Sequence, residues 1–275
     1  MTRPLIGTSW KMNLTPTRAA EWLRAARPLL EPLTADRDLF VLPPFPALTV
    51  ARDALAGSGI GYGGQDIHPE DHGAHTGDVS GAMLADLGCS YAEVGHSERR
   101  RDHGETDELV GRKVRAALRW SLTPVMCVGE RLRGPVAPAR RIVERQLAGA
   151  LGPFAPDELD RVVVAYEPVW AIGEGSVAAS ASHVERLHLA IDRWLADRGA
   201  TVRRVVYGGS VDERSAPELL ATAGVAGLFV GRAALDPHRF AAIAAAPIRL
   251  PSSDRHPDVQ QPLTRLAQPV TERSA

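Results

Sequence analysis

The stretch VVVAYEPVWAIGEG, residues 162–175, joins an apolar run to one carboxylate and then to a loop with two glycines. The run over 162–166 predicts a buried strand, which ends before Pro168 because proline cannot donate a hydrogen bond to a neighbouring strand. Glu167 therefore stands where a buried strand ends. Such a glutamate either reaches solvent from a turn or serves as a base beneath a closing loop.

Similar short apolar runs recur along the chain, with segments of helical spacing such as Val184, Leu187 and Ile191 between them. Including the run before Glu167, they end near Ser9, Pro43, Gln65, Gly95, Val128, Glu167, Gly208 and Val230. Apolar strands that alternate with helices indicate a parallel sheet covered by helices. Eight such repeats predict an α/β fold, a single closed (β/α)₈ barrel. An open doubly wound sheet is the alternative, but no G-x-G-x-x-G follows a strand.

The composition predicts one domain and excludes several classes of partner. We expect the barrel over residues 1–247 and a disordered tail over 248–275, where the chain is rich in proline and polar residues. A formal net charge of −1 argues against a nucleic-acid or polybasic membrane role. The sequence has no apolar run long enough for a transmembrane helix and no signal-peptide pattern. These features predict a cytoplasmic protein, in which Cys89 and Cys127 are buried reduced thiols in strand-like surroundings.

Residues that directly follow the strands of such a barrel lie together at one face. This rule brings a cation, an imidazole and a carboxylate together, namely Lys11, His96 and Glu167. Lys11 is notable because the chain has only two lysines among 32 basic residues. The rule also places these residues at the same face: Ser9, Gln65, Glu130, Ser210, Gly231 and Arg232.

These side chains and loops predict a definite chemistry. The small residues after the last two strands offer free backbone N–H groups, which with Gly173 can form a nest for a phosphate. An anion would be held there while a carboxylate moves a proton next to a carbonyl group polarised by Lys11 and His96.

Five stretches, in order on successive strand ends, resemble the triosephosphate isomerase family over roughly residues 4–245. They are WKMN (10–13), GHSERR (95–100), CVGE (127–130), AYEPVWAIG (165–173) and YGGSV (207–211). The resemblance implies that Glu167 is the base, His96 a neutral electrophile and Lys11 an electrostatic partner. It further implies proton transfer through a cis-enediol(ate) on a small phosphorylated sugar, with no metal and no organic cofactor.

The resemblance also assigns supporting roles. It implies that Pro168, Val169 and Trp170 form the hinge of a closing lid, which would exclude water from the intermediate. We expect Glu98, Glu130 and Tyr207 to support the hinge or the reacting groups rather than to act as bases. The other expected roles are ion pairs at the subunit contact for Arg99 and Arg100, and a structural role for Lys113 on a helix.

The loop over 65–78, from Gln65 to Asp78, contains His68, His72 and His75. Their spacing matches no standard zinc pattern, so we expect no metal. The loop resembles the family's long third loop, which inserts into the partner subunit. This predicts a homodimer in which Thr76 reaches the partner's Lys11.

Two departures from the family pattern bear on the substrate. The family reads GNWKMN where this chain has Ser9, and VGGASL where this chain has VGRAAL with Arg232. Arg232 can still offer its backbone N–H to a phosphate provided that its φ is negative. Ser9 is shorter than asparagine, so it would leave room for one more hydroxymethyl group, and its hydroxyl could still bind a substrate oxygen.

These departures, with the lid stretch AIGEGSVAAS, resemble the branch of L-erythrulose-1-phosphate isomerases of erythritol catabolism. The first prediction is therefore the interconversion of L-erythrulose 1-phosphate and D-erythrulose 4-phosphate. The alternative is the interconversion of dihydroxyacetone phosphate and D-glyceraldehyde 3-phosphate, as in glycolysis and gluconeogenesis. A third, distant reading is a barrel that binds a phosphorylated metabolite without turnover.

Overall fold

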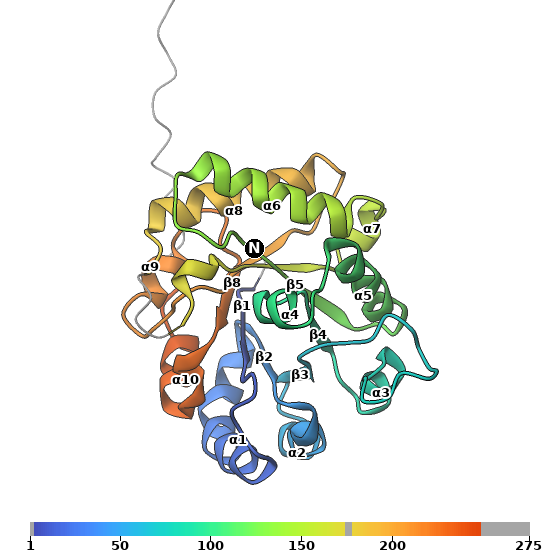
Figure 1. The fold of residues 1–275 in the computed structure, drawn as a ribbon. Helices are drawn as coiled ribbons and strands as arrows, with labels where there is room; N and C mark the ends of the chain where they lie inside the picture. The colour runs from blue at the N-terminus through green and yellow to red at the C-terminus, as the bar shows by residue number, and fades with distance from the viewer. Residues whose placement is uncertain (1–2, 174–177, 249–275) are drawn as a thin grey trace, which may run out of the picture.

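A closed barrel of parallel strands forms the centre of the molecule (Figure 1). The computed structural model describes residues 3–173 and 178–248. Neighbouring strands pair in chain order, and the last pairs with the first. The strands are β1 (Leu5–Ser9), β2 (Asp38–Leu42), β3 (Gly61–Gly64), β4 (Tyr91–Val94), β5 (Thr123–Val128), β6 (Val163–Tyr166), β7 (Arg204–Tyr207) and β8 (Gly227–Val230).

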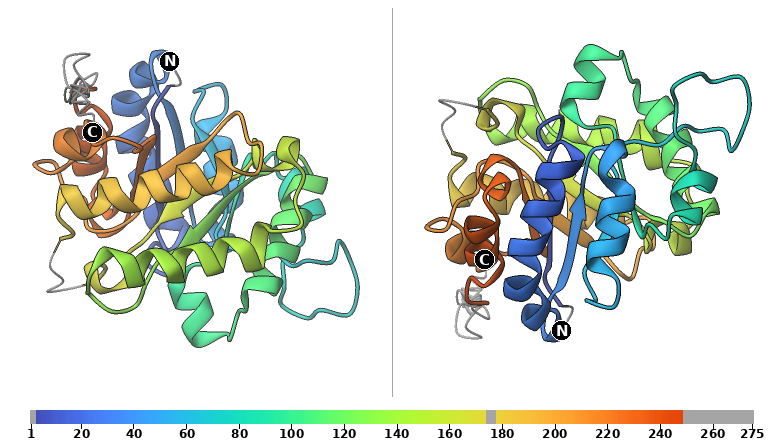
Figure 2. Two further views of the ribbon diagram at one scale, coloured as in Figure 1. Left: turned by 90° about the horizontal axis from the view of Figure 1, so that it is seen from above. Right: turned by 90° about the horizontal axis from the view of Figure 1, so that it is seen from below.

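Helices surround the strands, as two opposite views show (Figure 2). The α-helices are α1 (Pro16–Leu30), α2 (Leu48–Leu55), α3 (Gly81–Asp86), α4 (Ser97–Asp102), α5 (Asp107–Arg119), α6 (Val136–Leu151), α7 (Pro156–Leu159), α8 (Ala181–Ala196), α9 (Ala216–Leu220) and α10 (Pro237–Ala244). Short 3₁₀ helices are η1 (Glu31–Ala35), η2 (Phe45–Ala47), η3 (Val169–Ala171) and η4 (Arg232–Leu235). Helices α1, α5 and α8 each begin at a Ser or Thr that caps the helix; in α5, for example, the side chain of Thr106 accepts a hydrogen bond from the backbone N–H of Leu109.

The predicted (β/α)₈ barrel is confirmed, and the alternative of an open doubly wound sheet is wrong. Each predicted strand end lies within two residues of the observed one. The helical spacing of Val184, Leu187 and Ile191 also holds, since all three are buried in α8. The predicted disordered tail over 248–275 lies outside the described residues except for Ile248.

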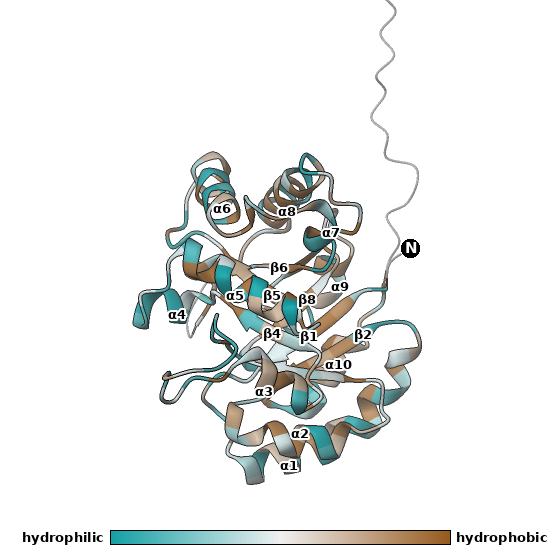
Figure 3. Ribbon diagram, turned by 90° about the vertical axis from the view of Figure 1, so that its right-hand side faces the viewer, coloured by the Kyte–Doolittle hydropathy of each residue, from teal (hydrophilic) through white to brown (hydrophobic). Residues whose placement is uncertain are grey.

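Two apolar cores follow from the two faces of the sheet. The larger core fills the space between the strands and the helices, whereas the smaller one fills the barrel and includes Leu5, Phe40, Val125 and Phe229. Brown strands and banded brown and teal helices show this division (Figure 3). Because successive strand residues face opposite sides, every second residue of a strand points into the barrel.

This alternation brings polar residues to one end of the barrel interior. Ser9 is an even number of residues from Leu5, which points into the barrel, so it points the same way. The same holds for Glu93 relative to Tyr91, and for Glu167 relative to Val163 and Ala165. Cys127 belongs to the interior core itself. The four residues Ser9, Glu93, Cys127 and Glu167 therefore share the mouth of the barrel, at the carboxyl ends of β1, β4, β5 and β6.

Both cysteines are free and buried, as predicted. Cys127 lies on β5, but the prediction of a strand-like position for Cys89 is wrong: Cys89 lies in the turn between α3 and β4, where its N–H donates to Leu84. Within residues 3–173 and 178–248, no helix has the length and apolar character needed to cross a membrane.

Candidate active site

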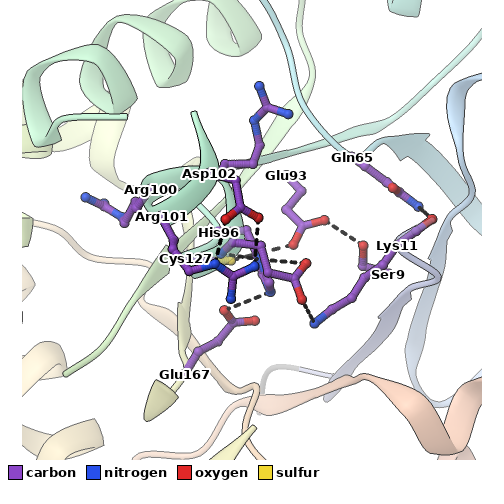
Figure 4. Close-up of polar contacts among 12 residues, drawn as sticks. Ser9, Lys11, Gln65, Glu93, His96, Arg100, Arg101, Asp102, Cys127 and Glu167 are labelled. Atoms are coloured by element: carbon purple, nitrogen blue, oxygen red, sulfur yellow. Dashed lines mark hydrogen bonds and ion pairs between the residues drawn. The ribbon is translucent and has the colours of Figure 1, made fainter. Parts of the chain in front are cut away.

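Lys11, His96 and Glu167 meet at the mouth of the barrel, as their positions after β1, β4 and β6 predict (Figure 4). His96 Nε2 lies 3.4 Å from Glu167 Oε2. All three residues border a cavity of about 720 Å³, which also receives Ser9 and Gly173. The cavity is large enough for a small phosphorylated sugar.

The backbone of Lys11 adopts a conformation that a lysine rarely takes. Its φ is +53°, and among the described non-glycine residues only Ser121 shares a positive φ. Gln65 stabilises this turn, because its Nε2 donates to the carbonyl of Lys11 at 3.0 Å and to that of Leu42 at 2.9 Å. A left-handed residue held by its surroundings is a common feature of functional sites. Gln65 thus ties the end of β3 to the lysine loop.

The ammonium group of Lys11 is held beside Glu98 on α4. Lys11 Nζ donates to Glu98 Oε1 at 2.9 Å. Burial lowers the pKa of Lys11, but the bond to Glu98 and the charges of Glu167, Glu98 and Glu93 outweigh burial and raise it above the ordinary value. Lys11 therefore stays a cation at the mouth of the cavity.

His96 begins helix α4, and this position sets its tautomer. Its Nδ1 accepts a hydrogen bond from the backbone N–H of Glu98 at 3.1 Å. Nδ1 is therefore unprotonated, and the proton of the neutral ring is on Nε2, which faces Glu167. Burial and, second, the charge of Lys11 lower the pKa of His96 to about 4. His96 both caps the helix and presents a neutral N–H donor to the cavity.

Glu167 is almost fully buried, and its carboxylate is left short of partners. Its backbone N–H donates to Val128 at 2.8 Å, which fixes it at the end of β6. Among the described residues its Oε2 has no hydrogen-bond partner. A side chain at Gly208 would come within 2.7 Å of the Glu167 side chain, so glycine leaves room for it. Burial, followed by the charge of Glu93, raises the pKa of Glu167 to about 8.

The opposite side of the cavity is suited to an anion. Ser210, Gly231 and Arg232 line it, with Arg101 and Arg239 nearby. The condition set for Arg232 is met, since its φ is not positive. Gly231 caps the short helix η4, which begins at Arg232 directly after β8. Backbone N–H groups at the start of such a turn favour an anion.

Residues 168–170 are tied to Glu130, which is buried after β5. Trp170 Nε1 donates to Glu130 Oε1 at 2.7 Å, and the N–H of Val169 donates to the carbonyl of Glu130 at 2.9 Å. Tyr166 adds hydrogen bonds from its hydroxyl to both carboxylate oxygens at 3.1 Å. Glu130 is thus fully engaged as a structural partner of this segment.

Tyr207 is buried at the end of β7, between the ring of Tyr166 and the glycine turn that follows. A side chain at Gly209 would come within 2.2 Å of its hydroxyl. Burial raises the pKa of Tyr207, and the backbone of Ala179 lowers it to a smaller degree. Tyr207 therefore lies between the glycine turn and the residues just beyond 177.

The expectation for Ser9 needs a correction. Its hydroxyl was expected to be available to a substrate oxygen, but Ser9 Oγ donates to Glu93 Oε2 at 2.7 Å. The hydroxyl proton is therefore already used, and only the oxygen lone pairs can meet a ligand. The carboxyl group of Glu93 forms part of the cavity wall beside Ser9, so this part of the wall is polar.

The structure also changes the picture for two arginines. Arg99 pairs with Asp66 at 2.8 Å and Glu105 at 2.6 Å, and Arg100 pairs with Asp107. These ion pairs lie within one chain, and the expected place of the two arginines at a subunit contact stays a prediction. Lys113, as expected, is a buried residue of α5 bound to Asp66 and Glu105.

Glu93 is the site residue that sequence reasoning missed. It lies on β4, is 2% exposed and borders the cavity. The run YAEV was taken as an ordinary apolar strand. A charge in such a strand, two residues before Gly95 and with the parity of interior residues, was the available signal.

The loop between β3 and α3 brings possible ligands together despite their unusual spacing. Ligand atoms of His68, His75 and Asp78 lie within 4.8 Å of one another. His68 Nδ1 already accepts the N–H of Glu70 at 3.1 Å, and the His68 and Asp78 side chains are 3.7 Å apart. These contacts describe a pair of a partly buried His68 and an exposed Asp78, and the expectation of no metal remains a prediction.

The fold is a (β/α)₈ barrel, and Lys11, His96 and Glu167 border a cavity at the carboxyl ends of its strands. The family model of triosephosphate isomerase matches residues 4–247. The triosephosphate isomerase of Thermus thermophilus is 44% identical over 88% of this chain and 98% of its own length. That of Mycobacterium avium is 43% identical over 88% of this chain and 96% of its own length.

A solved structure agrees with these sequence relatives. The crystal structure of triosephosphate isomerase from Bartonella henselae superposes with a TM-score of 0.77 at 36% identity, covering 88% of this chain and 98% of that one. The chain belongs to the triosephosphate isomerase family. It is an isomerase of the intramolecular oxidoreductase type, and its family acts on small phosphorylated sugars.

Proposed function

We propose that this chain moves a proton between two adjacent carbons of a sugar phosphate, with Glu167 as the base, His96 as a neutral donor and Lys11 as a cation. The convergence of these groups carries the proposal. Glu167 lies 3.4 Å from His96 Nε2, and Lys11 borders the same cavity. A carboxylate whose Oε2 has no hydrogen-bond partner among the described residues, beside a neutral imidazole, suits proton transfer next to a carbonyl.

The reaction proceeds in two balanced halves. Glu167 takes a proton from the carbon beside the carbonyl, and the C–H electron pair forms the double bond of an enediol(ate). His96 Nε2–H and the ammonium of Lys11 stabilise the charge that grows on oxygen. Glu167 then returns the proton to the former carbonyl carbon. The hydroxyl oxygen of the first carbon gives up its proton as the new C=O bond forms there, and the former carbonyl oxygen gains a proton through His96 Nε2, so that every proton is accounted for. A pKa of about 8 makes Glu167 a stronger base than an ordinary carboxylate.

The anion side of the cavity supports a role in holding the phosphate. In this proposal, backbone N–H groups at Ser210, Gly231 and Arg232 bind the phosphate together with Gly173. The glycine turn after β7 and the short helix η4 support this, because both present backbone close to the cavity. Holding the phosphate fixes the reacting carbons against Glu167.

Residues 168–170 act as a hinge in this proposal, and Glu130 keeps the hinge in register. The bond from Trp170 to Glu130 and the short helix η3 support this role. Closure over the cavity would exclude water and protect the enediol(ate). Tyr207 and Glu98 support the loop and the lysine respectively.

The relatives' names favour the three-carbon reaction, the interconversion of dihydroxyacetone phosphate and D-glyceraldehyde 3-phosphate, and we propose it first. The four-carbon reaction, L-erythrulose 1-phosphate to D-erythrulose 4-phosphate, is the second candidate. One observation favours it: the cavity wall carries Ser9 and Glu93, a polar pair suited to a further hydroxyl group.

Direct assays of the purified chain test the proposal. Both substrate pairs are supplied without added metal, and product is followed by coupled enzymes or by ¹³C NMR. Turnover of either pair supports the isomerase mechanism, and the larger kcat/KM identifies the substrate. Phosphate binding without turnover of either pair would instead favour the non-catalytic barrel.

We further propose a cytoplasmic homodimer that forms through the loop over 65–78. Residues 72–78 are exposed in the single chain, and Thr76 is among them. An exposed stretch without regular structure between β3 and α3 is suited to insertion into the partner. Sedimentation or small-angle scattering should give twice the chain mass of 29.5 kDa, and a monomer at micromolar concentration would contradict the proposal.

A further inference from the structure

Glu93 is a buried carboxyl group inside the barrel mouth that has few partners. Ser9 Oγ donates to its Oε2 at 2.7 Å, and Cys127 Sγ lies 3.8 Å from its Oε1. None of the ion pairs found among residues 3–173 and 178–248 includes Glu93. A carboxylate can accept about four hydrogen bonds, so most of its capacity faces the cavity or remains unused.

Such a group does not serve packing. Its neighbours inside the barrel are apolar or small, including Val125, Cys127 and Ala165. An apolar side chain of similar size would fill this position without the desolvation cost of a buried carboxyl group. A carboxyl group at an otherwise apolar position of the barrel interior, at a cavity wall and with no compensating ion pair, points to a function.

The position of Glu93 brings it within reach of a bound substrate. Oxygen atoms of Glu93 and Glu167 lie within 4.8 Å of each other, and both residues border the cavity. The carbon that Glu167 deprotonates must lie about 3–3.5 Å from its carboxylate. A hydroxyl group one carbon further along the substrate can therefore meet Glu93 at hydrogen-bonding distance.

We propose that Glu93, held by Ser9, binds a hydroxyl group of the substrate and selects ketose phosphates that carry a hydroxymethyl group beyond three carbons. The inference rests on the isomerase function proposed above and develops its second candidate, the four-carbon substrate. Glu93 places a carboxyl group in an otherwise apolar part of the wall. Because a carboxylate accepts hydrogen bonds, the substrate group that meets it should be a donor, such as the hydroxyl of a hydroxymethyl group. A second phosphate or carboxylate would be repelled by Glu93 and Glu167.

Ser9 and Glu93 act as one unit in this proposal. The serine hydroxyl uses its proton on Oε2 of Glu93, which fixes the carboxyl rotamer, and the Cys127 thiol is a weak donor to Oε1. The remaining lone pairs of the two oxygens are left for the ligand. A bond between charged and neutral partners discriminates by about 10- to 100-fold. A three-carbon substrate leaves Glu93 without this bond and pays no other penalty in the cavity.

The test is the ratio of kcat/KM for L-erythrulose 1-phosphate to kcat/KM for dihydroxyacetone phosphate. Glu93→Val should lower this ratio by about 10- to 100-fold, because the hydroxyl group loses its acceptor. Glu93→Gln keeps an acceptor oxygen and should lower it less. Ser9→Ala should lower it in the same direction, since the carboxyl group is no longer held. A purely structural role would change both substrates together and leave the ratio unchanged.

Val125→Ala is the matched control, since Val125 pairs with Glu93 in the β4–β5 register and also faces the barrel interior. It should reduce stability and leave the ratio within about threefold of the wild-type value. If Glu93→Val does not fold, Glu93→Gln and Ser9→Ala carry the same measurement.

Two results overturn the inference while the isomerase function stands. One is a wild-type chain that turns over dihydroxyacetone phosphate but gives no detectable turnover of the four-carbon substrate. The other is a ratio that stays within about threefold in folded Glu93→Val or Glu93→Gln. A wild-type chain inactive on both substrates would instead remove the proposed function itself, and the inference with it.

Discussion

Two clusters of buried carboxyl groups, one around α4 and α5 and one at the barrel mouth, differ in their electrostatics. The paired cluster comprises Asp66, Arg99, Glu105 and Lys113. Lys113 Nζ donates to Asp66 at 2.6 and 2.8 Å and to Glu105, and Arg99 binds both acids. Burial raises the pKa of Glu105, but its bonds to Lys113 and Arg99 bring the pKa below the ordinary value.

The open cluster comprises Ser9, Glu93, Cys127 and Glu167 at the barrel mouth. It places two carboxyl groups within 4.8 Å and no cation between them. Burial raises the pKa of Glu93 to about 7 and that of Glu167 to about 8. Burial also raises the pKa of Asp66 in the paired cluster, where it outweighs the opposite effect of Lys113 and Arg99. Of the four carboxyl groups, Asp66 and Glu105 form ion pairs with Lys113 and Arg99. The difference teaches that burial and the nearby cations together decide what a buried acid does.

Removing the base from the open cluster should have the largest effect. Glu167→Gln keeps the shape but cannot accept a proton, so kcat should fall by roughly 10²–10⁴. Steady-state assays measure this, with binding of inorganic phosphate and circular dichroism as evidence of an intact site and fold. Near-normal turnover would exclude Glu167 as the base.

Breaking the paired cluster should affect stability and not chemistry. Lys113→Met leaves Asp66 and Glu105 with fewer buried partners, so the free energy of unfolding should fall by about 3–5 kcal/mol. Urea titration measures this. The control is Arg112→Met, on the same helix as Lys113. It removes an exposed ion pair with Glu70 and should lower the free energy of unfolding by less than about 1 kcal/mol. Equal losses in the two variants would contradict the distinction between the clusters.

The open cluster should lose stability as the pH rises. Since the folded-state pKa values of Glu93 and Glu167 exceed 4.5, the folded chain binds these protons more tightly than the unfolded chain. Their favourable contribution is complete below about pH 4.5 and is lost as the pH rises through about 7 and about 8. Glu93→Gln should therefore stabilise the chain at pH 8 by on the order of 1–3 kcal/mol and have little effect near pH 4.5.

Thermal unfolding of the wild-type chain and of Glu93→Gln, from about pH 4.5 to about pH 8, measures the difference in stability between them. The same substitution in the paired cluster, Glu105→Gln, serves as the control, because the pKa of Glu105 is lowered and the sign reverses. A stabilisation by Glu93→Gln that does not depend on pH would show that Glu93 carries the same charge throughout.

The smallest expected effect is on the pH dependence of catalysis. Glu93 raises the pKa of Glu167 through its charge, while Lys11 lowers it. Glu93→Gln should therefore move the rising limb of kcat/KM for the three-carbon substrate to lower pH. Glu98, Cys127 and His96 face the same space and stay unchanged in this variant. A limb that does not move would mean that Glu93 is already protonated when Glu167 titrates.

Much of the fold could be predicted because its signals are local. Apolar runs and helical spacing repeat along the chain, and a closed parallel barrel is the arrangement that buries eight such runs. Residues that follow barrel strands lie at one face, and this rule places Lys11, His96 and Glu167 together. It does not give the distances between their side chains. For Cys89 the same kind of reasoning failed, since an apolar neighbourhood alone does not separate a strand from the turn before it.

The amino-acid sequence by itself determined the barrel, the face that holds the site and the residue types that meet there. Only the tertiary structure decided the long-range partners: Gln65 at the carbonyl of Lys11, Glu98 at the ammonium group of Lys11, and Ser9 at Glu93, 84 residues away. Periodicity is a property of neighbours in the chain, whereas these contacts depend on barrel closure and on the register between strands. For that reason Glu93 looks like one charge in an apolar strand, and becomes part of the site only when β1, β4 and β6 meet.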